Sequence, residues 1–186
     1  MAIGTGLLIL IIILVIILLW FILSYNSFIR LRNRMENAWS QIDVQLKRRF
    51  DLIPNLMETV KGYMKHEKDT LKEVTEARTA FLNAKEPRGM LKAEDKLQGA
   101  LKTIFAVSER YPTLRASENF MQLQEELSGT ESKIAYSRQH FNDSVQTWNE
   151  KVQSFPSNLI SKLFNFGKRD FLETSAQERQ NVKVKF

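Results

Sequence analysis

The sequence has 186 residues, with 27 Lys and Arg against 21 Asp and Glu, a net charge of +6 and no cysteine. The missing cysteine excludes a disulfide framework and a lipid anchor on a thiol, and it is compatible with a reducing compartment. The basic residues are interleaved with acidic ones rather than gathered on one stripe. We therefore expect anionic lipid as their partner, and not nucleic acid.

The first predicted element is a transmembrane anchor over residues 1–24. Its centre is the run Leu7–Leu23, which contains no charged side chain. As a helix this run would cover about 25 Å, close to the roughly 30 Å of a hydrocarbon core. The run is too long for a cleaved signal peptide, and neither a basic start nor a small-residue cleavage pattern accompanies it. Trp20 and Tyr25 lie where interfacial aromatic residues are expected.

The charges beside the anchor predict its orientation. Basic residues close to a span stay on the cytoplasmic side of the membrane. Arg30, Arg32 and Arg34 follow the run, whereas no basic side chain precedes it. We therefore expect the N-terminus outside, residues 26–186 in the cytoplasm, and these three arginines at the membrane interface.

Residues 25–155 show apolar positions at steps of three and four, the pattern of amphipathic helices. The first helix is expected to continue from the span and to end at a tight corner over Asp51–Leu56. There Asp51 would cap the next helix and Pro54 would lie in its first turn, with a kinked continuous helix as the alternative. A heptad seam from Ile53 to Phe81 predicts the second helix, which ends near Ala84.

The third helical region is predicted to begin near Met90, with an interruption at Tyr111–Pro112. The Ser128–Glu131 stretch has the spacing of a capping box and predicts the start of a fourth helix, which ends before Phe155. Short connections between helices of this length predict an antiparallel four-helix bundle with coiled-coil-like packing. The expected fold class is therefore all-α, with an N-terminal transmembrane helix.

In such a bundle the fourth helix runs back toward the membrane, so the tail, residues 156–186, is expected to begin near the bilayer. An amphipathic basic segment at this place can lie in the interface. Its basic residues are Lys162, Lys168 and Arg169. The alternative is that Leu163, Phe164 and Phe166 cover the end of the bundle. Residues 181–186 alternate like a short strand, with a frayed terminus as the alternative.

Few residues indicate chemistry. Four charged residues fall at core positions of the heptads, and we expect them to form Arg–carboxylate pairs that fix register. They are Glu67, Arg78, Glu131 and Arg138. His66 and His140 lack the Glu-x-x-His spacing of di-metal bundles, and no phosphate loop or nucleophile motif occurs. The sequence predicts no catalytic residue, cofactor or metal site, although triads assemble only in space.

The stretch Asn37–Leu56, which contains Arg-Arg-Phe-Asp-Leu-Ile-Pro-Asn-Leu, resembles the LemA family of bacterial membrane proteins. Similar motifs are Val107–Pro112 and Phe141-Asn142, whereas Trp148-Asn149 stands where the family has Tyr-Asn. The resemblance implies a single-span inner-membrane protein with a cytoplasmic four-helix bundle and no agreed activity. One related protein takes part in building magnetosome membranes, and family genes often lie near those for membrane proteases.

Two functional hypotheses are favoured over a third, an enzyme, which would require a deep polar pocket around the charged core positions named above. The first is a membrane-anchored, non-enzymatic scaffold that binds the bilayer, forms a homo-oligomer and organises or remodels the membrane. The second is an adaptor for a membrane protease or an envelope-stress partner, with its partner-binding residues at the expected corner. Those residues are Arg48, Arg49, Asp51 and Asn55.

Overall fold

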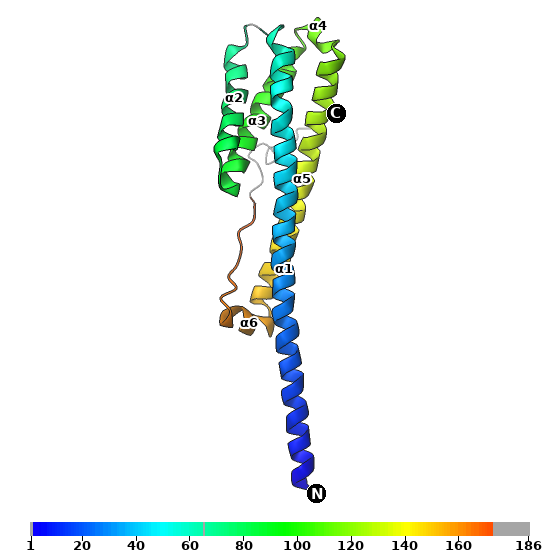
Figure 1. Ribbon diagram of the computed structural model, residues 1–186, viewed down its shortest axis with the longest axis vertical. Helices are drawn as coiled ribbons and strands as arrows, with labels where there is room; N and C mark the ends of the chain where they lie inside the picture. Colours follow the sequence, from blue (N-terminus) through cyan, green and yellow to red (C-terminus); the bar gives the residue numbers. More distant parts are fainter. Residues whose placement is uncertain (1, 65, 173–186) are drawn as a thin grey trace, which may run out of the picture. The chain divides into compact units, whose positions relative to one another are not determined.

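The computed structural model describes residues 2–64 and 66–172, and all the regular structure in these residues is helical, which confirms the all-α class. The helices are α1 (Ala2–Lys61), α2 (Lys68–Asn83), α3 (Pro87–Ser108), α4 (Pro112–Arg115), α5 (Glu118–Gln153) and α6 (Ser157–Leu163) (Figure 1). The described residues form two compact units. Unit 1 contains residues 2–40 and 138–172, and unit 2 contains residues 41–64 and 66–137.

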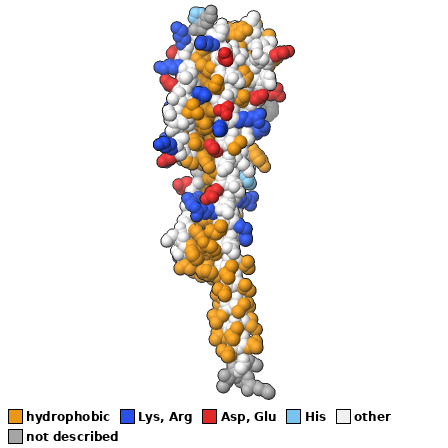
Figure 2. Space-filling model, viewed as in Figure 1, with side chains coloured by type: hydrophobic (Ala, Val, Ile, Leu, Met, Phe, Trp, Pro, Cys, Tyr) orange, Lys and Arg blue, Asp and Glu red, His pale blue; other side chains and the backbone are white. Residues whose placement is uncertain are grey.

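The N-terminal part of α1 matches the predicted anchor. The side chains of Leu7–Leu19 are all exposed, and the apolar window of α1 is long and hydrophobic enough to cross a membrane by length and composition. Figure 2 shows this part of the molecule as a shaft covered by hydrophobic side chains. A helix that is apolar on every side and touches no protein fits a lipid environment.

The predicted corner at Asp51–Leu56 is wrong, because α1 continues through it to Lys61. A proline inside a helix removes one hydrogen bond and costs about 3 kcal/mol. Here Pro54 lies on the exposed side, while Ile53 and Leu56 on the opposite side are fully buried. Burying one such side chain contributes about 1.5–3 kcal/mol, so packing offsets the cost of the proline.

The predicted helix start at Ser128–Glu131 is also wrong, since these residues lie inside α5. The Thr130 hydroxyl donates to the carbonyl of Leu127 at 2.7 Å, and the Ser132 hydroxyl donates to the carbonyl of Ser128 at 3.3 Å. Hydroxyl side chains can satisfy helix carbonyls in this way as well as cap a helix. The capping spacing is therefore present without a cap.

The other predicted boundaries agree better with the structure. α2 ends at Asn83, and Pro87 occupies the first turn of α3, where its missing N–H costs nothing. The interruption at Tyr111–Pro112 is present, followed by the short helix α4. The predicted second helix is wrong as a single helix, because α1 ends at Lys61 and α2 begins at Lys68. Its heptad positions are nevertheless buried or half-buried; examples are Val60, Met64, Val74 and Phe81.

The core of unit 1 is aromatic. Phe28 and Met35 from α1 pack with Val145 and Trp148 from α5 and with Ile160 from α6. The rings of Phe28 and Trp148 meet edge to face at 5.5 Å, a geometry that aromatic pairs prefer. Further half-buried residues pack around this cluster; they are Trp20, Phe21, Tyr25, Leu31, Phe141, Val152 and Phe166.

The core of unit 2 is mostly aliphatic and draws on α1, α2, α3 and α5. Phe50 of α1 stacks on Phe81 of α2 at 4.0 Å, and Phe105 of α3 meets Phe120 of α5 edge to face. The fully buried aliphatic side chains include Ile42, Leu46, Leu56, Val74, Leu97, Leu101, Ile104 and Leu127. Contacts from four helices therefore close this core.

Candidate functional site

The first candidate surface lies in unit 1, beside the end of the apolar run. The ring of Phe164 lies 4.7 Å from that of Tyr25 and 6.0 Å from that of Phe21. Phe166 packs against Phe28 at 5.0 Å and against Trp148 at 5.6 Å. The start of the tail is thereby held against α1 at the point where the apolar run ends.

The turn after α6 directs the tail to this place. Asn165 has a φ of 54°, a left-handed conformation that asparagine adopts more readily than most residues. The Phe166 N–H then donates to the Ser161 carbonyl at 2.8 Å, and the Asn165 N–H donates to the Lys162 carbonyl at 3.4 Å. This pair of bonds is a Schellman motif, which ends α6 and reverses the chain.

Beyond Phe166 the tail is paired with two asparagines of α5. The Asn149 side chain donates to the Arg169 carbonyl at 2.9 Å and accepts from the Arg169 N–H at 2.8 Å. Asn142 makes the same pair of bonds with Leu172, at 3.0 and 2.8 Å. Asn142 and Asn149 are seven residues apart on a helix, a rise of about 10.5 Å. Arg169 and Leu172 are three residues apart in an extended segment, about 10 Å, so the spacing of the asparagines matches that of the backbone groups they bind.

The Asn142–Asn149 pair was not predicted as a functional feature. Each amide side chain uses one N–H as a donor and its oxygen as an acceptor, so it binds an extended backbone as a neighbouring strand would. The Trp148 indole adds a hydrogen bond to the Gly167 carbonyl at 2.8 Å. The seven-residue spacing of the two asparagines on one helix face was the signal that could have revealed it.

The predicted interface residues have two kinds of environment. Trp20 and Tyr25 are half-buried against the aromatic cluster of unit 1. The basic ones are exposed; they are Arg30, Arg32, Arg34, Lys162, Lys168 and Arg169. Of the two alternatives for the tail, Phe164 and Phe166 do cover α1 and α5, whereas Leu163 remains largely exposed.

Lys151 joins this surface from α5. Its ammonium donates to the Ser27 hydroxyl and lies 5.3 Å from the centre of the Phe28 ring. Burial lowers the pKa of Lys151 below its ordinary value of 10.5, and the nearby positive charge of Arg30 lowers it further. Burial and the positive charge of Arg30 both disfavour an additional cation at this place.

The second candidate surface lies in unit 2 and includes the predicted partner-binding residues. Arg48, Asp51 and Asn55 are exposed, and their partner-binding role stays a prediction. Arg49 is only 2% exposed, so it is not available to a partner in this structure. Its guanidinium forms a salt bridge with Glu94, which is 3% exposed, because a buried charge requires an opposite charge beside it.

The buried arginine also connects further charged residues. Arg49 lies 3.4 Å from Glu131 of α5, and Gln98 of α3 donates to the same carboxylate. The expected interhelical pairing of Glu131 is therefore present, with a partner that the heptad analysis did not name. Glu67 pairs with Arg110 at 3.3 Å. The other two predicted core charges, Arg78 and Arg138, are half-buried.

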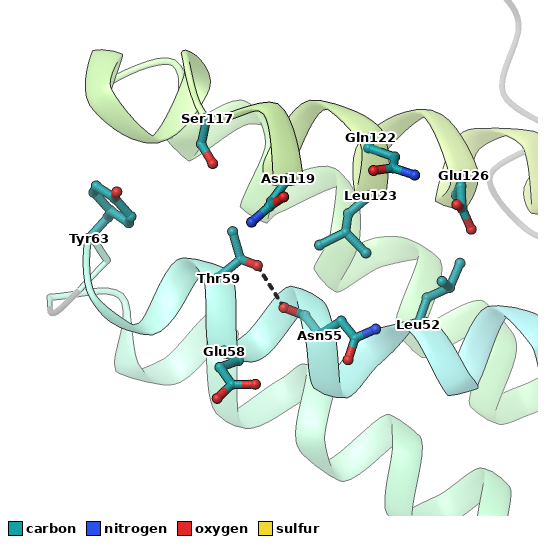
Figure 3. A pocket seen from close by; sticks show the side chains of 10 residues that line it. All are labelled: Leu52, Asn55, Glu58, Thr59, Tyr63, Ser117, Asn119, Gln122, Leu123 and Glu126. Atoms are coloured by element: carbon teal, nitrogen blue, oxygen red, sulfur yellow. Dashed lines mark hydrogen bonds between the residues drawn. The ribbon is translucent and has the colours of Figure 1, made fainter.

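An open groove of about 610 Å³ lies between α1 and α5 within unit 2 (Figure 3). Asn55, Glu58 and Thr59 of α1 and Asn119 and Gln122 of α5 line it. Figure 3 shows Thr59 and Asn119 pointing toward one another across it. The remaining lining residues are Leu52, Tyr63, Ser117, Leu123 and Glu126. Six of the ten lining residues have polar, uncharged side chains, so the groove offers hydrogen-bonding groups to a partner.

Within the described residues, no group of three or more His, Asp or Glu side chains is placed to hold a metal ion. His66 is exposed in the α1–α2 connection and His140 is half-buried on α5. The predicted strand at residues 181–186 lies outside the described residues.

Comparison with known proteins identifies relatives of this chain. A model of the LemA family matches residues 38–186. Protein LemA of Metamycoplasma hominis is 29% identical over 161 residues, which cover 84% of this chain and 72% of that protein. Magnetosome protein MamQ 2 of Paramagnetospirillum magneticum is 20% identical over 178 residues, and magnetosome protein MamQ of Magnetospirillum gryphiswaldense is 22% identical over 176 residues.

These matches cover 82% and 81% of this chain and 65% of each magnetosome protein, so the chain spans less than two thirds of either. The family match covers the C-terminal part of α1, all the later helices and the tail. On these matches the chain belongs to the LemA family.

Proposed function

We propose that this protein is a membrane-anchored, non-enzymatic scaffold of the bacterial inner membrane. The observation that carries the proposal is the continuity of α1, whose apolar run passes without a break into the packed core of unit 1. A tether for a freely moving domain needs only a flexible linker. A continuous helix instead keeps the packed residues at a fixed distance from the lipid, as a scaffold requires.

The finer features of the proposal come from charge and from the family. The exposed Arg30, Arg32 and Arg34 support an orientation with the N-terminus outside and the helical units in the cytoplasm. Contacts among α1, α2, α3 and α5 in unit 2 support an antiparallel four-helix bundle. Similarity to proteins named for the magnetosome supports a role in membrane organisation.

Self-assembly is the feature of the scaffold that most needs a test. The full chain is reconstituted in lipid nanodiscs, and the mass of single particles is measured over a range of protein-to-disc ratios. A self-assembling scaffold gives discs with a defined number of copies greater than one. A single copy per disc at every ratio contradicts self-assembly.

The proposed orientation is tested in intact cells. A protease added from outside is expected to leave the region around the buried Trp148 intact and to cleave it only after the cells are opened. Digestion of this region in intact cells contradicts the cytoplasmic placement.

A second candidate function is an adaptor that binds a protein partner in the α1–α5 groove. The polar groove beside the exposed Asn55 favours it, because such a surface can pair with a peptide backbone. Crosslinking in cells is compared between the unchanged chain, Asn55→Trp, which fills the groove, and Gln124→Trp on an exposed face of α5. A partner lost only with Asn55→Trp supports the adaptor, and identical crosslinks in all three contradict it.

A further inference from the structure

On the basis of the proposed anchor, we infer a second lipid contact. We propose that α6 and the residues flanking it lie in the membrane interface with one face embedded in the lipid. The embedded residues are Phe155, Leu159, Leu163 and Phe164. The last three belong to the amphipathic segment for which the sequence left open a place in the interface or a place over the end of the bundle. The protein would then hold the bilayer with an interfacial helix beside its transmembrane helix.

The first support is that α6 has apolar residues on two sides. Ile160 and Ser161 are buried in unit 1. Leu159 and Leu163, four residues apart and therefore on one face, are 55% and 65% exposed. Soluble surfaces rarely carry contiguous apolar patches of this kind without a partner.

The residues next to α6 extend the exposed apolar face. Phe155 is 80% exposed and Phe164 is 40% exposed. A phenylalanine buries about 150 Å² or more when it is covered, so two exposed rings beside two leucines are costly in water. The patch requires an apolar environment larger than one side chain.

The second support is the level of the patch along α1. Phe164 contacts Phe21 and Tyr25, and Ile22 and Leu23 between them are exposed and end the apolar run. If the run spans the hydrocarbon core, its last turn lies at the boundary with the headgroups. α6 is fixed beside that turn, so its outer face meets the same boundary.

Figure 2 shows the same arrangement, with a hydrophobic patch adjoining the hydrophobic shaft and basic side chains beyond it. Because the patch is continuous with the surface that faces lipid, lipid is its natural occupant. A protein partner at this level would itself have to enter the membrane.

The third support is charge. Lys162 is exposed between Leu159 and Leu163 on the outer side of α6, where a long side chain can reach the headgroups while its stem remains in apolar surroundings. Arg30 and Arg34 are exposed on α1 within the next turns beyond the boundary. Apolar residues at one level and cations just above it are the pattern of an interfacial helix on anionic lipid.

The test uses the absence of cysteine from the chain. Single cysteines replace Leu163, Ile16 in the apolar run, or Tyr136, which is 72% exposed in unit 2, and each carries a nitroxide label. The full chain is reconstituted in vesicles that contain phosphatidylglycerol. Collision of each label with oxygen and with a water-soluble nickel chelate is measured, since oxygen concentrates in lipid and the chelate stays in water.

The Leu163→Cys label is expected to collide with the chelate severalfold less often than the Tyr136→Cys label does. It is also expected to lie less deep in the lipid than the Ile16→Cys label. Equal chelate collisions at positions 163 and 136, with the label at 16 still in lipid, contradict the α6 contact and leave the anchor intact. A water-exposed label at position 16 overturns the anchor, and the α6 contact with it.

A second variant tests the charge and does not depend on the first comparison. Lys162→Glu places a carboxylate beside the headgroups, so the Leu163→Cys label is expected to become shallower in anionic vesicles than in neutral phosphatidylcholine vesicles. The control is Lys133→Glu, an exposed change in unit 2, which is expected to leave the label depth unchanged. A depth that is the same in both lipids with Lys162→Glu contradicts the role of Lys162.

Discussion

Unit 1 and unit 2 fill their cores with different chemistry. Unit 1 packs aromatic rings of α1 and α5 and closes them with the tail, which two asparagines and an indole bind by its backbone. Unit 2 packs aliphatic side chains around a salt bridge between Arg49 and Glu94. The directional contacts that fix the packing arrangement are therefore hydrogen bonds to the tail in unit 1 and a buried charge pair in unit 2.

This difference shows how two helices and four helices solve the same problem. Two helices alone leave much of an apolar stripe exposed, so unit 1 requires an extra segment to cover it. A core formed by four helices is covered already, but aliphatic contacts are non-directional and permit more than one register. A buried ion pair removes that freedom, although replacing it with apolar residues need not reduce stability.

The largest expected effect is that of Arg49→Ala. The change removes the guanidinium that faces the buried Glu94 carboxylate, so the free energy of unfolding should fall by about 3–5 kcal/mol. Urea unfolding of the reconstituted chain, followed by circular dichroism, measures it. Arg48→Ala, an exposed change one residue earlier, should stay within about 0.5 kcal/mol of the unchanged chain.

The paired variant Arg49→Met with Glu94→Met distinguishes stability from register. Because both charges are removed together, most of the lost stability should return. If the double variant is as unstable as Arg49→Ala, the ion pair contributes directly to the stability of unit 2, and its role is not limited to fixing the register of the helices.

The next effect is that of Phe166→Ala, which removes the ring that the tail packs against both Phe28 and Trp148. A fully buried phenylalanine costs about 3–5 kcal/mol when truncated to alanine, so a half-buried one should cost about 2–3 kcal/mol. Thermal unfolding of the reconstituted chain measures the loss. Phe171→Ala, more exposed in the same tail, is the matched control, and equal losses would show that the tail does not close the core of unit 1.

A smaller effect is expected for Asn149→Ala, which removes both hydrogen bonds to Arg169. Each bond contributes about 0.5–1.5 kcal/mol, so the loss of both should make the tail open more readily by about 1–3 kcal/mol. Hydrogen exchange at the Arg169 amide reports this opening directly. Gln146→Ala, on the exposed side of α5 where it bonds Glu150, should leave that exchange rate unchanged.

The smallest effect concerns pH and Lys151. Since burial lowers its pKa in the folded state below 10.5, the unfolded chain binds more protons between the folded pKa and 10.5. The free energy of unfolding should therefore rise with pH across that interval. Below it, the cost of burying the charged ammonium of Lys151 should be fully present. Urea unfolding at neutral and at alkaline pH measures this rise.

Lys151→Met should remove this part of the pH dependence, whereas Lys133→Met in unit 2 should retain it. An identical pH profile for the unchanged chain and Lys151→Met would show that the ammonium of Lys151 is as well solvated in the fold as in the unfolded chain.

Part of the candidate site was predictable from sequence. Basic residues after the apolar run and in the tail were expected to be exposed, and the structure leaves all six of them exposed, while their contact with lipid stays a prediction. The pairing of the tail with Asn142 and Asn149 was not predictable, because its partners are 20 and 30 residues apart in the chain. The same applies to Arg49, which was interpreted as part of a surface and is joined to Glu94 in the core.

The sequence by itself determined the helical class, the anchor run and the buried faces, because apolar periodicity reflects burial wherever a helix begins or ends. Only the tertiary structure decided the boundaries at Pro54 and Ser128, since caps and prolines contribute a few kcal/mol at most and the packing of neighbouring helices exceeds that. It also decided which charges pair and where the tail binds, because those contacts depend on residues that meet only after the chain has folded.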